Sequence, residues 1–193
     1  GLYFINAQGK DADKPTQIWT QGETESSSAW FPTIDKSNQK TTQEIYMTVP
    51  DKYVTLSNGI MKSSTKVSGG LRTDHWVMDK KHAPYLFFMG VGEYAIVKDK
   101  WRNIEVDYYV EKEYEPFAKQ IFGNTPEMIE FFSKRLSYDY PWSKYAQITG
   151  RDFVSGAMEN TTATLHQESA QQKPGDLIDE NRWEDTIAHE LFH

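Results

Sequence analysis

Residues 183–193 read WEDTIAHELFH, and this stretch decides how the second half of the chain is expected to fold. Apolar residues recur in it at helical spacing, at Trp183, Ile187 and Leu191. His189 and His193 are four positions apart, so a helix places both imidazoles on one side, one turn apart. The stretch therefore predicts a helix that starts near Asn181, with one buried face and one face that carries two metal ligands.

The residues between the two histidines add a base to this predicted metal site. Zinc binds imidazole nitrogens well, and a catalytic zinc site keeps one position open for water. Glu190 follows the first histidine directly, so its carboxylate can lie beside the ion without binding it and can accept a proton from an acidified water. The sequence thus predicts one Zn2+ ion held by His189 and His193, with Glu190 as the catalytic base.

A catalytic zinc site needs a third protein ligand, and the sequence offers no strong candidate. The other three histidines are His75, His82 and His166, and each is expected to be an ordinary surface or core residue. The third ligand is therefore expected beyond residue 193. The alternative interpretation, an accidental pair of histidines on a helix, is the false-positive risk of any short motif.

Composition limits the class of protein. The 193 residues are 38% hydrophobic and 14% aromatic, which predicts a packed core in one domain or in parts of two. A net charge of −7 argues against nucleic-acid or anionic-membrane partners, and no apolar run is long enough to span a bilayer. Cysteine is absent, which excludes disulfides and thiolate metal sites. No signal peptide is visible after Gly1, but a removed leader would leave none, so the localisation stays open. The oligomeric state stays open as well.

The periodicity of the chain changes near its middle. Short strand-like runs separated by turn residues fill the first part, at 43–49, 52–56, 72–78, 85–91 and 104–110. Turns are predicted at Ser57-Asn58-Gly59 and at 68–70. Beyond residue 110 the sequence predicts helices at 115–123 and from an N-cap at Thr125 to about Ser137. Strands follow at 146–149 and 161–165, and then a loop over 167–179.

A second motif, Gly156-Ala157-Met158-Glu159-Asn160, precedes the metal-binding helix. Together the two motifs resemble the aminopeptidase N family of zinc metallopeptidases, the gluzincin aminopeptidases that include leukotriene hydrolase-like enzymes. The resemblance implies a mixed α+β fold, with the end of an all-β, saddle-like N-terminal domain at 1–109. The start of a thermolysin-like α+β catalytic domain would occupy 110–193. It also implies that the third zinc ligand is a glutamate outside this sequence, as is a tyrosine that stabilises the oxyanion.

The resemblance assigns substrate-binding roles as well. An enzyme that acts only at a free amino terminus must bind an ammonium group, and a fixed carboxylate such as Glu159 can do so. Trp19-Thr20-Gln21-Gly22-Glu23 is similar to a family segment that reaches the active site, which implies that Gln21 shapes the first pocket and Glu23 is a second carboxylate. The expected substrate-binding residues are Gln21, Glu23, Gly156, Ala157, Met158, Glu159 and Asn160. Asn160-Thr161-Thr162 also matches a glycosylation sequon, which an active-site strand could not use.

The expected function is zinc-dependent hydrolysis of the amino-terminal residue from peptides. Two alternatives stay open: a thermolysin-like endopeptidase, and a non-catalytic module with a vestigial metal site. Acetylation of the substrate's amino terminus separates the first alternative from an aminopeptidase. With only two ligands present, residues 1–193 alone are expected to be inactive.

Overall fold

The computed structural model describes every residue from Gly1 to His193. The chain divides by its internal packing into two compact units. The first comprises Gly1–Glu93 together with Asn160–Ala163, and the second comprises Tyr94–Glu159 together with Thr164–His193. No helix in the chain has the length and apolarity needed to cross a membrane.

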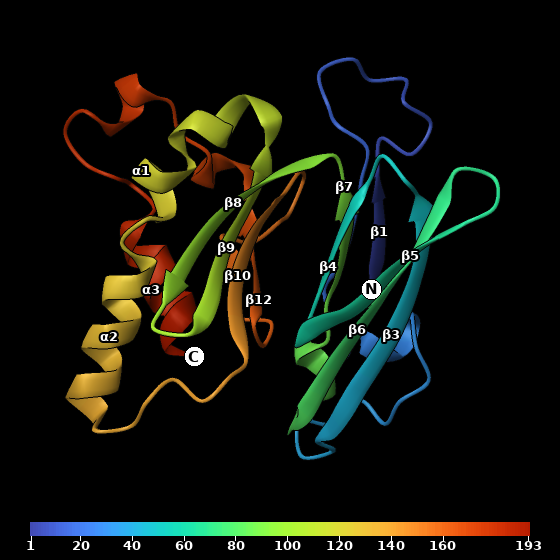
Figure 1. Cartoon of the computed structure of the whole chain (residues 1–193), viewed down its shortest axis with the longest axis horizontal. Helices are drawn as coiled ribbons and strands as arrows, with labels where there is room; N and C mark the ends of the chain where they lie inside the picture. The colour runs from blue at the N-terminus through green and yellow to red at the C-terminus, as the bar shows by residue number, and fades with distance from the viewer. The chain divides into compact units, whose positions relative to one another are not determined.

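The first unit consists of two antiparallel sheets. One sheet has four strands in the order β1-β2-β7-β4, and the other has three in the order β3-β6-β5 (Figure 1). Their bounds are β1 Leu2–Ile5, β2 Gln17–Thr20, β3 Thr41–Pro50, β4 Val54–Ser57, β5 Ile60–Val67, β6 Leu71–His82 and β7 Met89–Gly92.

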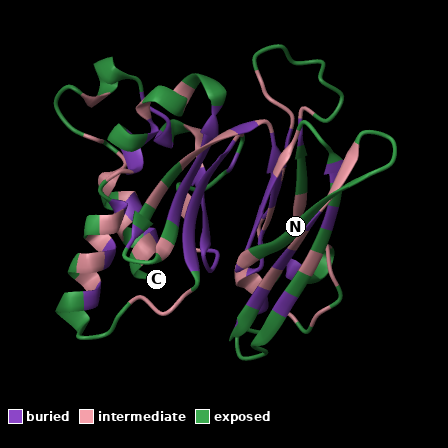
Figure 2. Cartoon of the chain, in the orientation of Figure 1, coloured by how far each residue is buried: buried purple, intermediate pink, exposed green.

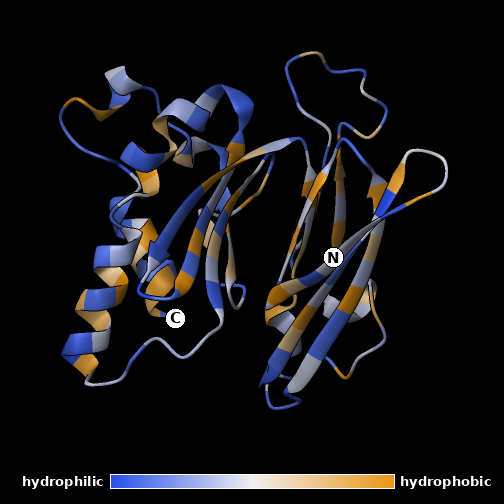
Figure 3. Cartoon of the chain, in the orientation of Figure 1, coloured by the Kyte–Doolittle hydropathy of each residue, from blue (hydrophilic) through white to orange (hydrophobic).

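Alternation along β3 and β6 produces the interior of this unit. Buried Met47 on β3 and buried Trp76 on β6 are each flanked by more exposed residues, so bands of opposite hydropathy alternate along these strands in Figure 3. Hydrogen bonds link polar side chains within this interior. The Trp76 indole Nε1 donates to Thr55 Oγ1 at 2.9 Å, and that hydroxyl donates to Asp74 Oδ2 at 2.7 Å. These bonds join β4 to β6.

The predicted turn at Ser57-Asn58-Gly59 is confirmed. The Asn58 side chain also binds backbone groups outside the turn. Gly59 has a φ of +75°, and a Cβ there would overlap the carbonyl of Val77, so only glycine fits. The buried Asn58 amide donates to Leu86 O (2.9 Å) and Thr161 O (2.7 Å), while its Oδ1 accepts from Phe88 N (2.7 Å). One side chain thus supplies partners for three backbone groups.

The single buried strand predicted at 85–91 is wrong in part. Pro84–Leu86 form a 3-10 turn, and the strand β7 begins only at Met89. Pro84 lacks an N–H, and the Asn58 side chain takes the Leu86 carbonyl and the Phe88 N–H that a ladder would use. The predicted burial does hold, because Phe87 and Phe88 are both buried.

The second unit is a five-stranded sheet with helices on one face. The strand order is β11-β12-β10-β9-β8, and β9 and β10 are parallel. Figure 2 shows both of these strands buried along almost their whole length. The bounds are β8 Tyr94–Trp101, β9 Ile104–Glu111, β10 Lys144–Gly150, β11 Ala157–Met158, β12 Ala163–Gln167, α1 Ala118–Phe122, α2 Thr125–Leu136 and α3 Glu184–Phe192.

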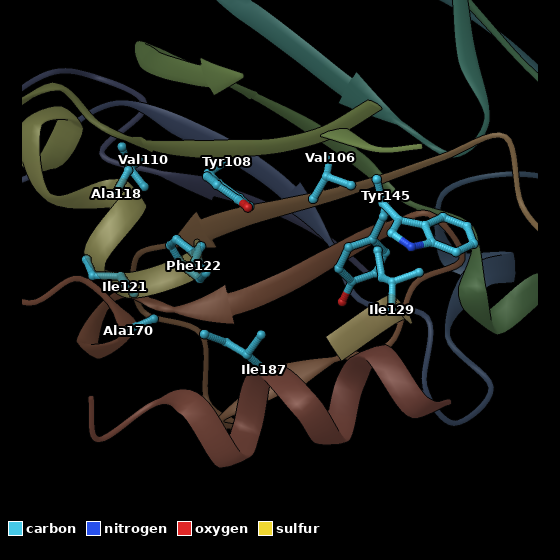
Figure 4. Close-up of a cluster of buried hydrophobic side chains, with 11 residues drawn as sticks. Val106, Tyr108, Val110, Ala118, Ile121, Phe122, Ile129, Tyr145, Ala170 and Ile187 are labelled. Carbon is cyan, nitrogen blue, oxygen red and sulfur yellow. The ribbon is translucent and has the colours of Figure 1, made fainter. Parts of the chain in front are cut away.

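One apolar cluster joins this sheet to its helices. Each helix contributes buried residues that pack against side chains of β9 and β10 (Figure 4). The labelled members are Val106, Tyr108, Val110, Ala118, Ile121, Phe122, Ile129, Tyr145, Ala170 and Ile187. All three helices therefore cover the same face of the sheet.

The helix boundaries differ slightly from those predicted. Thr125 is the first residue of α2 and not its N-cap, which is Asn124, because the Thr125 hydroxyl donates backwards to Phe122 O at 2.6 Å. The helical stretch predicted at 115–123 is a 3-10 segment, Lys112–Phe117, followed by α1, and it ends at Gly123 as predicted.

The strands and the loop of the second unit also differ from the predictions. The strand predicted at 161–165 is β12, two residues later, because Thr162 has a φ of +66°, which lies outside the strand region. The predicted loop at 167–179 contains two short 3-10 turns, Glu168–Ala170 and Pro174–Leu177. These shifts leave the element types intact, apart from the two added turns.

The fold class is confirmed as mixed α+β, a β part followed by the start of an α+β part. The compact units divide between Glu93 and Tyr94, whereas the predicted domains divide between 109 and 110. The difference arises because β8 and β9 form a hairpin and β9 also pairs with β10. The domain assignment at 1–109 and 110–193 stays a prediction.

Replacement of Asn58 by leucine tests the turn. Leucine matches asparagine in shape but leaves three buried backbone groups without their partner, and we expect a loss of about 3 kcal/mol in the free energy of unfolding. Urea unfolding followed by tryptophan fluorescence measures this loss. The control is Asn38→Leu, at an exposed position. Equal stability of the two variants would show that the Asn58 hydrogen bonds contribute nothing.

His82 makes the stability of the first unit depend on pH. Its ring stacks on Phe87 with centroids 4.4 Å apart, its Nδ1 lies 3.1 Å from Thr161 Oγ1, and burial lowers its pKa from 6.5 to about 4. The unfolded chain therefore binds a proton between pH 6.5 and 4 that the folded chain does not, so stability is fully present above pH 6.5 and falls on acidification.

Between pH 7 and pH 5 this histidine is expected to reduce the free energy of unfolding by about 2 kcal/mol. His82→Asn keeps an acceptor near Thr161 and removes the titration, so its urea midpoint should change less between the two pH values. The hypothesis fails if the parent and the variant lose equal stability on acidification.

Candidate active site

The two histidines of the predicted zinc site converge. His189 lies in the last turn of α3, and His193 follows the last helical residue. Their Nε2 atoms are 3.1 Å apart and their ring centroids 4.8 Å apart, and both side chains are exposed. Two imidazole nitrogens that point at one another from one side of a helix form the start of a metal site. The spacing therefore places the two predicted ligands as the sequence indicated.

Glu190 directly follows His189 and is one of the two buried residues of α3. It is 9% exposed, in contrast to the histidines on either side of it in the helix. Burial raises the pKa of the Tyr145 phenol on β10, and the charge of Glu190 raises it further. A buried carboxylate that directly follows one of two converging imidazoles can exchange protons with a molecule bound at those imidazoles.

Packing and polar contacts hold the start of α3. Ile187 is 1% exposed within the apolar cluster. Asn181 Oδ1 accepts from Trp183 N at 3.1 Å and its Nδ2 donates to Ile121 O at 2.6 Å, while Asn124 Nδ2 donates to Glu184 Oε1 at 2.6 Å. The helix starts at Glu184, three residues later than predicted, because the Asn181 side chain holds the Trp183 N–H in a turn before the helix.

No third ligand is in place. Nowhere in residues 1–193 do three His, Asp or Glu side chains gather as a metal site. The remaining histidines serve other contacts, as expected. His75 stacks on Tyr46 and lies 2.6 Å from Glu44 Oε1, and His82 and His166 are buried.

The second motif forms the edge of the five-stranded sheet. β11 pairs antiparallel with β12, Ala157 opposite His166 and Met158 opposite Leu165. Met158 is buried, while Ala157 is half-buried. Since β11 is the outermost strand, its other backbone edge has no strand of the sheet beside it.

The other residues of this motif divide into a buried and an accessible set. Asn160 is 1% exposed and neither atom of its amide has a hydrogen-bond partner, so the folded chain does not present the sequon for glycosylation. Glu159 is half-buried. Gly156 is exposed, and a Cβ there would meet nothing, so the chain itself does not need a glycine at this position.

Gln21 and Glu23 follow β2 in the first unit. Gln21 is half-buried, its N–H donates to Gly1 O at 2.9 Å, and Glu23 is exposed. Gly22 between them must be glycine, because a Cβ would overlap the carbonyl oxygen of Tyr85. The sequence analysis did not identify this requirement, since it depends on a residue far along the chain. A common site for Gln21, Glu23 and Glu159 stays a prediction.

Comparisons with known proteins give one consistent family. Residues 1–86 match the Peptidase M1 N-terminal domain, and residues 121–193 match the Peptidase family M1 domain. The predicted boundary at 109/110 and the division at 93/94 both lie between these matches.

Individual relatives are distant and much longer. Endoplasmic reticulum aminopeptidase 1 of Rattus norvegicus is 24% identical over the whole chain, which covers 21% of that protein. Aminopeptidase M1 of Arabidopsis thaliana is 28% identical over 99% of the chain and 22% of its own length. Transcription initiation factor TFIID subunit 2 of Danio rerio is 24% identical over 77% of the chain and 13% of its own length.

The chain thus spans about a fifth of the length of the two aminopeptidases. The two domain matches follow one another in the order of a single architecture and together take in most of the sequence. The chain belongs to the M1 family of peptidases.

Proposed function

We propose that this chain supplies the base, two zinc ligands and the ammonium-binding strand of a metallo-aminopeptidase that hydrolyses the amino-terminal residue from peptides. The observation that carries the proposal is the arrangement on α3. The Nε2 atoms of His189 and His193 converge to 3.1 Å, and Glu190 is buried on the inner side of the same turn. The aminopeptidase names of two of the three relatives described above support the same activity.

The two imidazole donors fit zinc in kind. Two neutral imidazole nitrogens are typical zinc ligands, and a catalytic site needs one more protein ligand, which we propose to be a glutamate outside residues 1–193. A bound zinc ion polarises the scissile carbonyl and makes a water a nucleophile near neutral pH.

Glu190 moves the proton in this proposal. Its carboxylate accepts a proton from the attacking water and passes it to the nitrogen of the leaving amine, so that one base serves both halves of the hydrolysis. Its burial and its position next to His189 limit the directions from which water can reach it.

The edge strand provides the exopeptidase character. Glu159 would bind the substrate ammonium by a charge-assisted hydrogen bond, and the outer edge of the sheet at β11 would pair with an extended peptide backbone. The open space beside Gly156 supports a close approach of that backbone. We propose that Gln21 and Glu23 complete this site, together with Ala157, Met158 and Asn160.

One relative favours a second candidate. TFIID subunit 2 is a transcription initiation factor by name, so a non-catalytic role is possible within the similarity range of this chain. The intact set of two histidines and a buried glutamate argues for catalysis. A thermolysin-like endopeptidase would need neither Glu159 nor Glu23.

Glu190→Gln tests the base. The amide keeps the size of the side chain but cannot accept the proton, so we expect kcat of the complete, zinc-loaded protein on an amino-acid naphthylamide to fall by about 100-fold or more. Zinc content, measured by mass spectrometry of the metal, should stay at that of the parent. Asp185→Asn, an exposed change in the same helix, is the matched control. Undiminished turnover in Glu190→Gln would overturn the assigned mechanism.

Glu159→Gln tests the ammonium site. Loss of the charge should raise KM for peptides with a free amino terminus by about 10-fold or more, the range of a charge-assisted hydrogen bond. Zinc content should not change. The parent should prefer free over acetylated peptides, and the variant should lose most of this preference. A parent enzyme that cleaves acetylated peptides equally well would identify an endopeptidase instead.

A further inference from the structure

One buried histidine lies between the strand of one motif of the proposed site and the start of the helix that carries the other. The backbone of His166 on β12 pairs with Ala157 of the ammonium-binding strand. Its side chain is 0% exposed and reaches the start of the zinc helix, where its Nδ1 lies 3.0 Å from the Trp183 indole Nε1. Its Nε2 lies 2.9 Å from Gln147 Oε1. All of these residues belong to the second unit.

The partners of this histidine determine its tautomer. An indole N–H can only donate, so Nδ1 of His166 must accept, and the proton must therefore sit on Nε2 and be donated to Gln147 Oε1. Gln147 Nε2 then donates to Thr125 Oγ1 at 2.8 Å, and that hydroxyl donates to Phe122 O at 2.6 Å. Burial lowers the pKa of His166 from 6.5 to about 3, which keeps the ring neutral and this order of donors intact.

The bond to Trp183 acts on the side of α3 that carries the base. Trp183 precedes the first helical residue, and its carbonyl accepts the first hydrogen bond of the helix, from Ile187 N at 2.9 Å. Residues four and seven positions further on lie on the same side of a helix as Trp183. These residues are Ile187 and Glu190, the two buried residues of α3. A bond that fixes the Trp183 ring therefore sets the rotation of the helix at Glu190.

The other polar contacts at this end leave rotation less constrained. Asn181 binds the backbone of Trp183 and of Ile121, close to the helix axis. Asn124 binds the Glu184 side chain through an exposed bond. The His166–Trp183 bond is different because it involves a ring far from the axis and an acceptor that is itself part of the sheet.

We propose that His166 is a positioning residue that joins the ammonium-binding strand to the zinc helix, and so fixes Glu190 relative to Glu159. This inference rests on the proposed function, since it gives His166 the role of fixing the distance between the catalytic base and the ammonium-binding carboxylate. The spacing matters because an aminopeptidase must place the scissile bond at a set distance from the substrate ammonium. A misplacement of about 1 Å in such an arrangement can reduce the rate by about 100-fold.

Two variants of equal shape separate this role from a structural one. His166→Asn and His166→Leu both shorten the side chain, and both lose the bond to Gln147. Only asparagine places an acceptor, Oδ1, where Nδ1 stands. We expect His166→Leu to lower kcat of the complete, zinc-loaded protein by about 10-fold to 100-fold with KM little changed, and His166→Asn to recover most of kcat. Trp183→Phe removes the donor instead and should behave like His166→Leu.

A second measurement is independent of turnover. Backbone amide exchange of α3, measured by deuterium uptake in the complete protein, should rise in His166→Leu and in Trp183→Phe but not in His166→Asn, while exchange of β10 stays at the parent level. Equal kcat and equal exchange for the asparagine and leucine variants would overturn the proposal. So would a rise in exchange throughout the second unit, which would show a loss of general stability.

The Glu190→Gln variant keeps the two hypotheses apart. If it retains turnover, the proposed function fails. If it loses turnover while Trp183→Phe and His166→Leu keep it, the function stands and the role of His166 is overturned.

Discussion

Burial of one face of α3 is the constraint on which the rest of the candidate site depends. Ile187 lies within the apolar cluster formed by β9, β10 and the three helices. Full burial of an isoleucine contributes about 1.5–3 kcal/mol, and this decides which side of the helix faces the sheet. Glu190, three positions later, must then point inward, while His189 and His193 remain exposed and converge. The same burial therefore positions an acid group and frees two ligands.

Local patterns account for what could be predicted from the sequence. The four-residue spacing of apolar residues and of histidines in α3 is a property of consecutive residues, and so is the turn at Asn58-Gly59. Both are confirmed. The strand predicted at 85–91 failed because a distant side chain, Asn58, takes over two of its backbone groups. Residues 85–91 alone give no indication of this competing side chain. The local pattern therefore predicted burial correctly and strand pairing incorrectly.

The candidate site follows the same division. The placement of the proposed ligands and base relative to one another could be predicted because they lie on or directly after one helix. The requirement for glycine at position 22 and the bond between His166 and Trp183 could not, since each joins residues that are separated in the sequence. The glycines themselves illustrate this. Position 22 must be glycine because a Cβ there would overlap a neighbouring backbone. Gly156 has open space beside it, so any need for glycine there arises from a molecule that binds.

The buried glutamate also bears on whether the site is vestigial. A carboxylate on the core face of a helix carries a desolvation cost of several kcal/mol, which an apolar residue at the same position would not. Ile187 and the ring of Trp183 show what this face otherwise contains. A helix that served only to cover the sheet would be more stable with leucine at position 190. Proton transfer, as proposed above, accounts for a carboxylate at this position, directly beside the first of two converging imidazoles.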